Sequence, residues 1–251
     1  MACRTTLNCE KCSHRNGPLC SAIRARAASV CPLVPEFERL EPGCAATDVS
    51  LKAGRFGILH TGLLLRCGAE TGMDVVSVGE PLGEAFRGNR EMRVTAVVPS
   101  EVCWYDVHEV EAAALRDPRL YGALVAATAQ TATLRRIFTR MRSTLMPVER
   151  LAGLLAICAH QVAERDRMGS LRLTLQCRPE DLATLLALSG GQLTEARDDL
   201  VERGLVVLHD GSTLEIPELA ALEDLAGIDL PQGAADAHMP SAGAMGERQR
   251  A

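Results

Sequence analysis

Residues 178–204 read RPEDLATLLALSGGQLTEARDDLVERG, and this stretch decides the fold of the C-terminal part of the chain. Pro179 stands at an early helical position and two acids follow it in the first turn, so a helix is predicted to begin there. Ser189-Gly190-Gly191 predicts a turn. Gln192–Arg203 then predicts a second helix, which Gly204 ends.

The segments on either side of these two helices predict a small sheet. Ser170–Cys177 alternates apolar and polar residues, as a half-buried strand does. Downstream, Val206–His209 and Thr213–Ile216 are joined by Asp210-Gly211, which is a hairpin signal. Helix, turn, helix and hairpin in this order predict a winged helix-turn-helix domain over residues 147–228. Residues 229–251 contain few large apolar side chains and are predicted to be a disordered tail.

Upstream of this domain, a heptad pattern predicts a long helix that ends near Pro147. Its stripe is narrower than the apolar face of most helices in globular domains, which favours a coiled-coil seam between two copies of the chain. The alternative is a helix that packs against its own domain. The predicted seam consists of Leu120, Leu124, Ala127, Thr131, Leu134, Phe138 and Met141.

The part of the chain before this helix is rich in Gly and Val and predicts short strands separated by turns. Many short strands at this spacing are typical of a small barrel or jelly roll. The expected fold class is therefore α+β. Four of the predicted strands are Phe56–His60, Leu63–Cys67, Asp74–Val78 and Val94–Val98.

Two motifs in this region add a resemblance to a known family. They are Gly62-Leu63-Leu64-Leu65-Arg66 and Val76-Ser77-Val78-Gly79-Glu80-Pro81-Leu82-Gly83-Glu84. With Arg178–Gly204, they make the chain resemble the CRP/FNR family of bacterial regulators. The resemblance implies a homodimer that binds DNA and has three structural parts. These are an N-terminal β-roll similar to cyclic-nucleotide-binding domains, a long dimerisation helix and a C-terminal winged helix-turn-helix.

The resemblance also divides the chain into parts. A cysteine-rich arm over residues 1–35 precedes a β-roll sensor over 36–110 and a dimerisation helix over 111–146. A cyclic nucleotide is not the expected ligand, because no Arg-Ser pair follows Glu84 to hold a phosphate.

The composition and the absence of long apolar stretches in the sequence predict a cytoplasmic protein with reduced thiols. The chain has 251 residues, of which 47% are apolar and 24% are charged, and this suits one large or two medium domains. It lacks a stretch of about 18 apolar residues and the apolar centre of a signal peptide, so we expect no membrane contact. In the reducing cytoplasm, clustered cysteines are better read as metal ligands than as disulfides, whereas Cys67, Cys158 and Cys177 are read as buried small apolar residues.

Cys9 and Cys12 form a C-x2-C pair, and Cys20 follows them. Thiolates at such spacing are the ligands that iron–sulfur clusters and zinc prefer. Within the CRP/FNR resemblance, they point to the oxygen-sensing FNR branch, which implies a [4Fe–4S] cluster with Cys103 as its fourth ligand. Cys3 or Cys31 is the substitute for Cys20, whose spacing is longer than the familiar one. The alternative to the cluster is zinc, with a further ligand such as His14.

The predicted recognition helix departs from the family pattern. The Glu and Arg that usually read base edges are replaced by Gly191 and Glu195, which leaves Gln192, Thr194 and Arg197 as the DNA-contacting candidates. Residues 147–228 carry seven Arg, no Lys and fourteen acids, a net charge of −7 that is unusual beside phosphates. The alternative is a redox-responsive interaction protein that holds a cluster or zinc, has the same fold and lacks ordinary sequence-specific DNA binding. Its C-terminal domain would meet a basic protein partner instead of DNA. RNA polymerase or another protein is also a candidate partner.

An enzyme is not expected from this sequence. It contains no G-x-S-x-G, P-loop, H-E-x-x-H or dinucleotide-binding fingerprint, and its six histidines are scattered. The sequence therefore predicts a homodimeric, cytoplasmic transcriptional regulator. It would sense oxygen, nitric oxide or redox state through a [4Fe–4S] cluster at Cys9, Cys12, Cys20 and Cys103.

Overall fold

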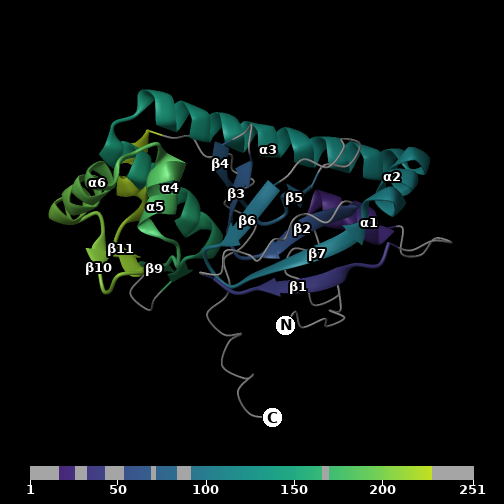
Figure 1. Ribbon diagram of the computed structural model, residues 1–251, viewed down its shortest axis with the longest axis horizontal. Helices are drawn as coiled ribbons and strands as arrows, with labels where there is room; N and C mark the ends of the chain where they lie inside the picture. The colour runs from purple at the N-terminus through teal and green to yellow at the C-terminus, as the bar shows by residue number, and fades with distance from the viewer. Residues whose placement is uncertain are drawn as a thin grey trace, which may run out of the picture. The chain divides into compact units, whose positions relative to one another are not determined.

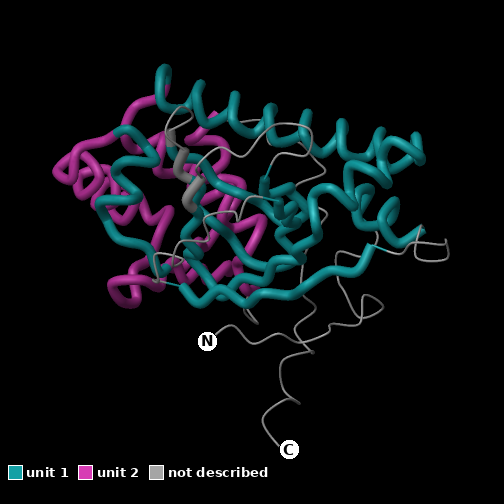
Figure 2. Tube along the Cα trace, turned by 45° about the vertical axis from the view of Figure 1, so that its right-hand side comes forward, with its two compact units in different colours: residues 1–144, 176–187 teal, residues 145–175, 188–251 magenta. Residues whose placement is uncertain are grey.

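The chain folds into two compact units, which Figure 2 distinguishes by colour. The structure, a computed structural model, describes residues 17–25, 33–42, 54–68, 72–83, 92–165 and 170–227. The first unit comprises residues 1–144 and 176–187, and the second comprises 145–175 and 188–251. The second unit begins two residues before the predicted C-terminal domain, and the segment 176–187 of that predicted domain belongs to the first unit. The predicted arm and tail fall mostly outside the described residues.

Two antiparallel sheets form the body of the first unit (Figure 1). The four-stranded sheet has the order β1 (Glu36–Leu40), β7 (Ser100–Asp106), β2 (Arg55–Thr61) and β5 (Pro81–Leu82). The three-stranded sheet has the order β4 (Gly72–Val76), β3 (Leu64–Gly68) and β6 (Met92–Ala96). One apolar core joins the two sheets, because it takes side chains from every one of these strands. It consists of Leu40, Leu59, Leu64, Val76, Leu82, Val94, Ala96, Val102 and Trp104.

Two glycines allow the β-strands to approach this closely. A Cβ on Gly57 would lie 2.6 Å from the ring of Trp104, and one on Gly62 would lie 2.7 Å from the Cα of Ser100. Gly62 also has φ +96°, a conformation that residues with side chains rarely adopt. The Ser100 hydroxyl is held at this turn by the backbone oxygen of Val98, at 2.8 Å. The turn between β2 and β3 therefore requires glycine.

Three helices cover the outer face of the four-stranded sheet. They are α1 (Pro18–Ala25), α2 (Val107–Arg116) and α3 (Pro118–Thr144). Asp106 begins α2 by accepting hydrogen bonds from the amides of His108 and Glu109. The single long helix that was predicted breaks at Asp117, because the residue before a proline disfavours helical geometry. We call the apolar core under these helices the helix-side cluster. It consists of Leu19, Ile23, Leu33, Phe37, Phe56, Ile58, Cys103, Tyr105, Val110, Ala113, Ala114, Leu120 and Leu124.

The heptad stripe on α3 faces its own protomer, so its prediction as a dimer seam is wrong. Leu120 and Leu124 belong to the helix-side cluster, and Thr131, Leu134, Phe138 and Met141 are also buried. Ala127 is half-buried against the same cluster. Side chains this buried within one chain have no surface left to offer a second copy. The heptad pattern was compatible with a dimer seam and with packing against its own domain, because the β-roll offers α3 the same kind of apolar surface as a partner helix would.

The described residues of the second unit form a helical layer and a small sheet. The buried helix α4 (Pro147–Val162) packs against α6 (Gly190–Glu202) and α7 (Leu219–Ala226). His160 of α4 and Glu223 of α7 form a hydrogen-bonded pair. The antiparallel sheet has the order β10 (Val207–Leu208), β11 (Thr213–Ile216), β9 (Leu171–Thr174) and β8 (Glu164–Arg165).

Helix α5 (Pro179–Leu186) precedes α6 in sequence but clusters with the first unit. The backbone amide of Gln176, just before α5, donates to the carbonyl oxygen of Val97 at 2.7 Å. Within the described part of the chain, none of the helices is both long enough and apolar enough to span a membrane.

Candidate functional site

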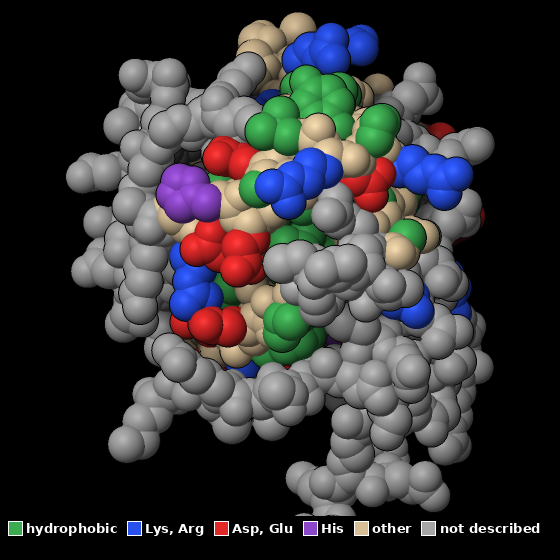
Figure 3. Space-filling model, turned by 90° about the vertical axis from the view of Figure 1, so that its right-hand side faces the viewer, with side chains coloured by type: hydrophobic (Ala, Val, Ile, Leu, Met, Phe, Trp, Pro, Cys, Tyr) green, Lys and Arg blue, Asp and Glu red, His purple; other side chains and the backbone are tan. Residues whose placement is uncertain are grey.

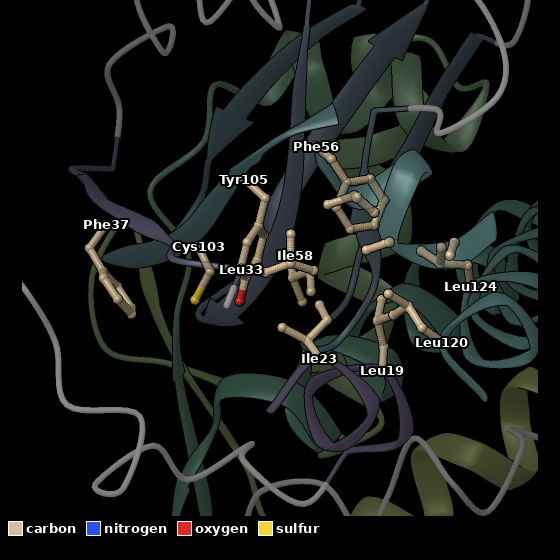
Figure 4. Close-up of a cluster of buried hydrophobic side chains, with 13 residues drawn as sticks. Leu19, Ile23, Leu33, Phe37, Phe56, Ile58, Cys103, Tyr105, Leu120 and Leu124 are labelled. Carbon is tan, nitrogen blue, oxygen red and sulfur yellow. The ribbon is translucent and has the colours of Figure 1, made fainter. Parts of the chain in front are cut away.

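Cys103 lies on β7 and points to the helix side of the sheet. Its strand neighbours Val102 and Trp104 belong to the core between the two sheets, whereas Cys103 belongs to the helix-side cluster. The alternation follows from the two-residue period of a strand. Across the sheet, Cys103 pairs with Phe37 of β1 and Ile58 of β2. Figure 4 shows its sulfur between the rings of Phe37 and Tyr105. Its side chain is 7% exposed, so the thiol lies at an apolar, nearly dry position.

The helix α1 brings Cys20 to the same cluster. Leu19 and Ile23 of α1 are buried there, and Cys20 is half-buried against it. Leu19 lies beside Leu120 of α3 in Figure 4. The structure therefore places Cys20 and Cys103, which are far apart in sequence, against one cluster of side chains. Two of the four predicted thiol ligands are thus positioned on one side of the β-roll.

The remaining predicted ligands, Cys9 and Cys12, lie outside the described residues, as do the substitutes Cys3 and Cys31 and the zinc alternative His14. Among the residues that the structure describes, no three of His, Cys, Asp and Glu come together as a metal site. Thiols at an apolar position fit a thiolate-bound metal, because coordination removes the proton and the metal compensates the buried charge. The two thiol donors that the structure describes therefore fit the group.

The other described cysteines lie in surroundings that suit packing. Cys158 is buried in α4 of the second unit. Burial, with a smaller contribution from the charge of Asp181, raises the pKa of Cys177 to about 11. A thiol with such a pKa stays protonated near neutral pH and is a poor nucleophile. These two residues behave as small apolar side chains.

A buried group of charges joins the three-stranded sheet to α3. The guanidinium of Arg66 on β3 donates to both oxygens of Asp74 on β4, at 2.8 and 2.9 Å. Arg135 of α3 donates to the second oxygen of Asp74 at 2.9 Å. Arg66 and Asp74 are 3% and 4% exposed, so water does not screen their attraction. We call these three residues the Asp74 clamp. The sequence motif that includes Arg66 gave no sign of its partners.

Glu80 adds a buried carboxyl to the same region. Burial raises its pKa, against the opposing effects of the Ser77 amide, the Arg66 charge and the Thr131 hydroxyl. The amide of Ser77 donates to its Oε2 atom. The carboxyl therefore favours its neutral form more than an exposed glutamate does. It lies on the turn that enters β5, against residue Thr131 of α3.

The three DNA-contacting candidates lie on the first two turns of α6, and all are exposed. Each is already bonded within its own helix region. Gln192 forms a capping box with Ser189, in which its Oε1 accepts from the Ser189 amide at 2.9 Å. Thr194 donates to the carbonyl oxygen of Gly190, and Arg197 donates twice to one oxygen of the adjacent Asp198.

Other exposed charges near α6 are paired in the same local way. Arg203 donates to both oxygens of Asp199, at 2.7 and 2.9 Å, and this pairing raises its pKa. Asp210, at the hairpin between β10 and β11, accepts from the amides of Ser212 and Thr213. These two amides lower the pKa of Asp210, so the hairpin tip carries a stable negative charge. In the first unit, Arg178 donates to both oxygens of Asp181 just before α5.

The comparisons with known proteins identify the fold. No family model and no curated protein matches the chain. FixK2 from Bradyrhizobium japonicum is 15% identical and has a TM-score of 0.64, with 79% of this chain and 100% of that chain covered. A CRP-family transcriptional regulator from Thermus thermophilus is 20% identical with a TM-score of 0.60, and the coverage is 77% and 98%.

A further transcriptional regulator of the CRP/FNR family from the same organism is 20% identical, with a TM-score of 0.57 and coverage of 77% and 99%. The two Thermus thermophilus structures are those of transcriptional regulators, not of enzymes. The predicted resemblance is thereby confirmed at the level of the fold. This chain has the mixed helix and sheet fold of CRP/FNR-type transcriptional regulators.

Proposed function

We propose that this chain is a cytoplasmic transcriptional regulator that senses oxygen, nitric oxide or redox state through a [4Fe–4S] cluster. Its ligands would be Cys9, Cys12, Cys20 and Cys103. The observation that carries the proposal is that Cys20, from α1, packs against the same helix-side cluster to which Cys103, from β7, belongs. Zinc at the same thiols remains the alternative cofactor.

The packing of α1 suggests how such a site would act. When bound, the cluster supplies a thiolate-anchored centre that oxidants can destroy. Cys20 would anchor α1 to β7 through Cys103. Leu19 and Ile23 of α1 belong to one cluster with Leu120 and Leu124 of α3. Loss of the anchor would therefore weaken the cover over the first turns of α3, and that helix would carry the change onward.

The output would be a winged helix-turn-helix that binds DNA. In this assignment α5 and α6 are the two helices, α6 enters the major groove, and β10 and β11 form the wing. Gln192, Thr194 and Arg197 would contact bases or phosphates from the start of α6. The fold shared with CRP/FNR-type regulators supports this assignment.

The homodimer would form through the outward face of α3, opposite the buried stripe. From Leu120 to Leu134 the helix carries no charged residue, and Tyr121 and Val125 are about half exposed at 49% and 52%. Gly122, Ala126 and Ala129 on the same stretch are small enough to let two helices approach closely. Figure 3 looks onto the end of the first unit that carries α2 and the start of α3, where apolar side chains gather near the top.

Val125→Glu should dissociate the dimer in sedimentation equilibrium, whereas Arg136→Glu, on a charged exposed turn, should not.

Iron and acid-labile sulfide per chain test the cofactor, measured on protein purified without oxygen. We expect about four of each, with a visible absorption that bleaches in air. Cys103→Ala should lose the iron, whereas Cys158→Ala, a buried thiol of the second unit, should retain it. Equal iron in both variants would remove Cys103 from the ligand set. Zinc in place of iron would support the alternative cofactor.

A second candidate function is an interaction protein with this fold that lacks ordinary DNA binding. It is favoured by the local pairing of Arg197 and Arg203 and by the negative tip at Asp210. A gel shift with genomic fragments, using the protein with its cofactor intact, separates the two. Saturable retardation that resists competitor DNA supports the regulator. Its absence, together with retention of purified RNA polymerase, supports the interaction protein.

A further inference from the structure

The three residues of the Asp74 clamp differ in how far they are exposed to solvent. Arg66 and Asp74 are almost fully buried, but the side chain of Arg135 is 36% exposed. The two interactions of Asp74 therefore differ in how readily they break. The pair with Arg66 lies within the sheet, where β3 and β4 place the two residues directly opposite each other. The contact with Arg135 reaches out to α3, at the boundary with solvent.

Breaking the two contacts leaves different charges behind. If the pair between Arg66 and Asp74 broke, the guanidinium of Arg66 would stay buried without its partner, which is strongly unfavourable. If Arg135 leaves, Asp74 and Arg66 remain as a neutral pair that is bonded through both carboxylate oxygens. Arg135 then moves into water, where its charge is solvated. The outer contact can thus open without an isolated charge remaining buried.

A second contact tethers the same part of α3. Arg142 lies two helical turns after Arg135 and donates to the backbone oxygen of Met73 at 3.2 Å. Both arginines therefore hold adjacent residues of β4. Phe138 and Met141 are buried between them along the helix. Two arginines thus tie the C-terminal half of α3 to the edge strand of the three-stranded sheet, and its apolar side chains are buried.

We propose that Arg135 acts as a releasable contact, through which the β-roll sets whether the C-terminal half of α3 is docked. Opening would leave residues 134–144 of α3 held by Arg142 and by buried apolar side chains alone, while the sheet stays intact. The inference concerns the transmission of a signal along α3, and in this respect it rests on the proposed regulatory function. The contact itself is independent of any cofactor or DNA, so it can fail or succeed separately.

Hydrogen–deuterium exchange of the full chain tests the contact, with mass spectrometry used to resolve peptides of α3. In Arg135→Gln, backbone amides of residues 134–142 should exchange faster by about tenfold or more, as expected when a charged hydrogen bond is lost. Peptides from β2 and β7 should keep their protection. The matched control is Arg136→Gln, because Arg136 bonds within its own helix, to Ala132 and Thr133. Arg135→Lys should restore part of the protection, since it keeps the charge.

Three outcomes would overturn the inference. Equal exchange in Arg135→Gln and Arg136→Gln would show that the contact with Asp74 does not hold the helix. Faster exchange throughout the first unit would show that Arg135 stabilises the whole fold and releases nothing locally. Equal loss of protection in Arg135→Lys and Arg135→Gln would show that the charge is not what docks α3. Because these measurements use neither iron content nor DNA binding, failure of the proposed cofactor leaves their interpretation unchanged.

Discussion

The Asp74 clamp of the first unit and the arginines of α6 in the second unit form ion pairs of opposite kinds. In the first, Arg66 and Asp74 are buried, and they connect two strands and, through Arg135, a helix. In the second, Arg197 and Arg203 are exposed and bond to carboxylates one and four residues away. A pair that joins distant parts of the chain in a dry environment contributes to the fold, whereas an exposed local pair contributes little. The exposed pairs affect DNA binding instead, because their arginines are bonded to carboxylates and are not available to contact phosphates.

The largest effect is expected from removal of the buried carboxylate. Asp74→Asn keeps the shape of the side chain but leaves Arg66 buried without a counter-charge. The first unit should lose about 3–5 kcal/mol of its free energy of unfolding. Denaturant unfolding followed by fluorescence measures it, since Trp104 is the single tryptophan and belongs to the core of this unit. A loss below about 1 kcal/mol would show that the clamp is not screened from water as its burial implies.

The next effect concerns the exposed pairs of α6. Asp198→Asn with Asp199→Asn removes the partners of Arg197 and Arg203 and two negative charges beside them. If α6 meets DNA, the affinity should rise by about tenfold at low salt and its salt dependence should become steeper, because more phosphates are neutralised. Fluorescence anisotropy with a labelled duplex at several salt concentrations measures both. Glu218→Gln, an exposed acid of the same unit, is the control for net charge. An unchanged salt dependence in the double variant would support the interaction protein.

A smaller, pH-dependent effect is expected at Glu80. Burial raises the folded-state pKa of this carboxyl above its ordinary value of 4.5. A group with a raised folded pKa stabilises the fold most below its unfolded pKa and loses that contribution as the pH rises. Between about pH 5 and about pH 8, the free energy of unfolding of the wild type should fall relative to that of Glu80→Gln, because the glutamine cannot ionise. Urea unfolding at a series of pH values measures both free energies. A constant difference between the two proteins over this range would contradict the raised pKa.

The sequence predicted the positions of many elements better than their partners. The predicted strands Phe56–His60 and Val94–Val98 overlap β2 and β6, because alternation and glycine turns are local signals. The helix α3 was also predicted, but its stripe was assigned to the wrong surface. Apolar periodicity shows that a face is covered and does not show what covers it. The short helix α7 gave too brief a pattern to be recognised.

The same distinction applies to the candidate sites. Cys103 was found through its place in a resemblance, and its direction follows from strand alternation. Asp74 and Arg135 are 61 residues apart, and only the folded β-roll brings them together. The pairing of Arg197 with Asp198 could have been read from their adjacency. Long-range charge networks therefore required the structure, whereas local ones were already visible in the sequence.

The smallest effect is expected at an exposed pair that matches the clamp in geometry. Arg178 donates to both oxygens of Asp181, as Arg66 does to those of Asp74. The Arg178 side chain is 76% exposed, so water solvates its charge when the partner is lost. Asp181→Asn should therefore leave the Trp104 unfolding midpoint unchanged, under the conditions in which Asp74→Asn shifts it strongly. The two substitutions remove the same group from the same bidentate arrangement, so their difference measures burial together with the second partner that Asp74 has in Arg135. A comparable loss in both would mean that bidentate geometry, rather than desolvation, gives the clamp its strength.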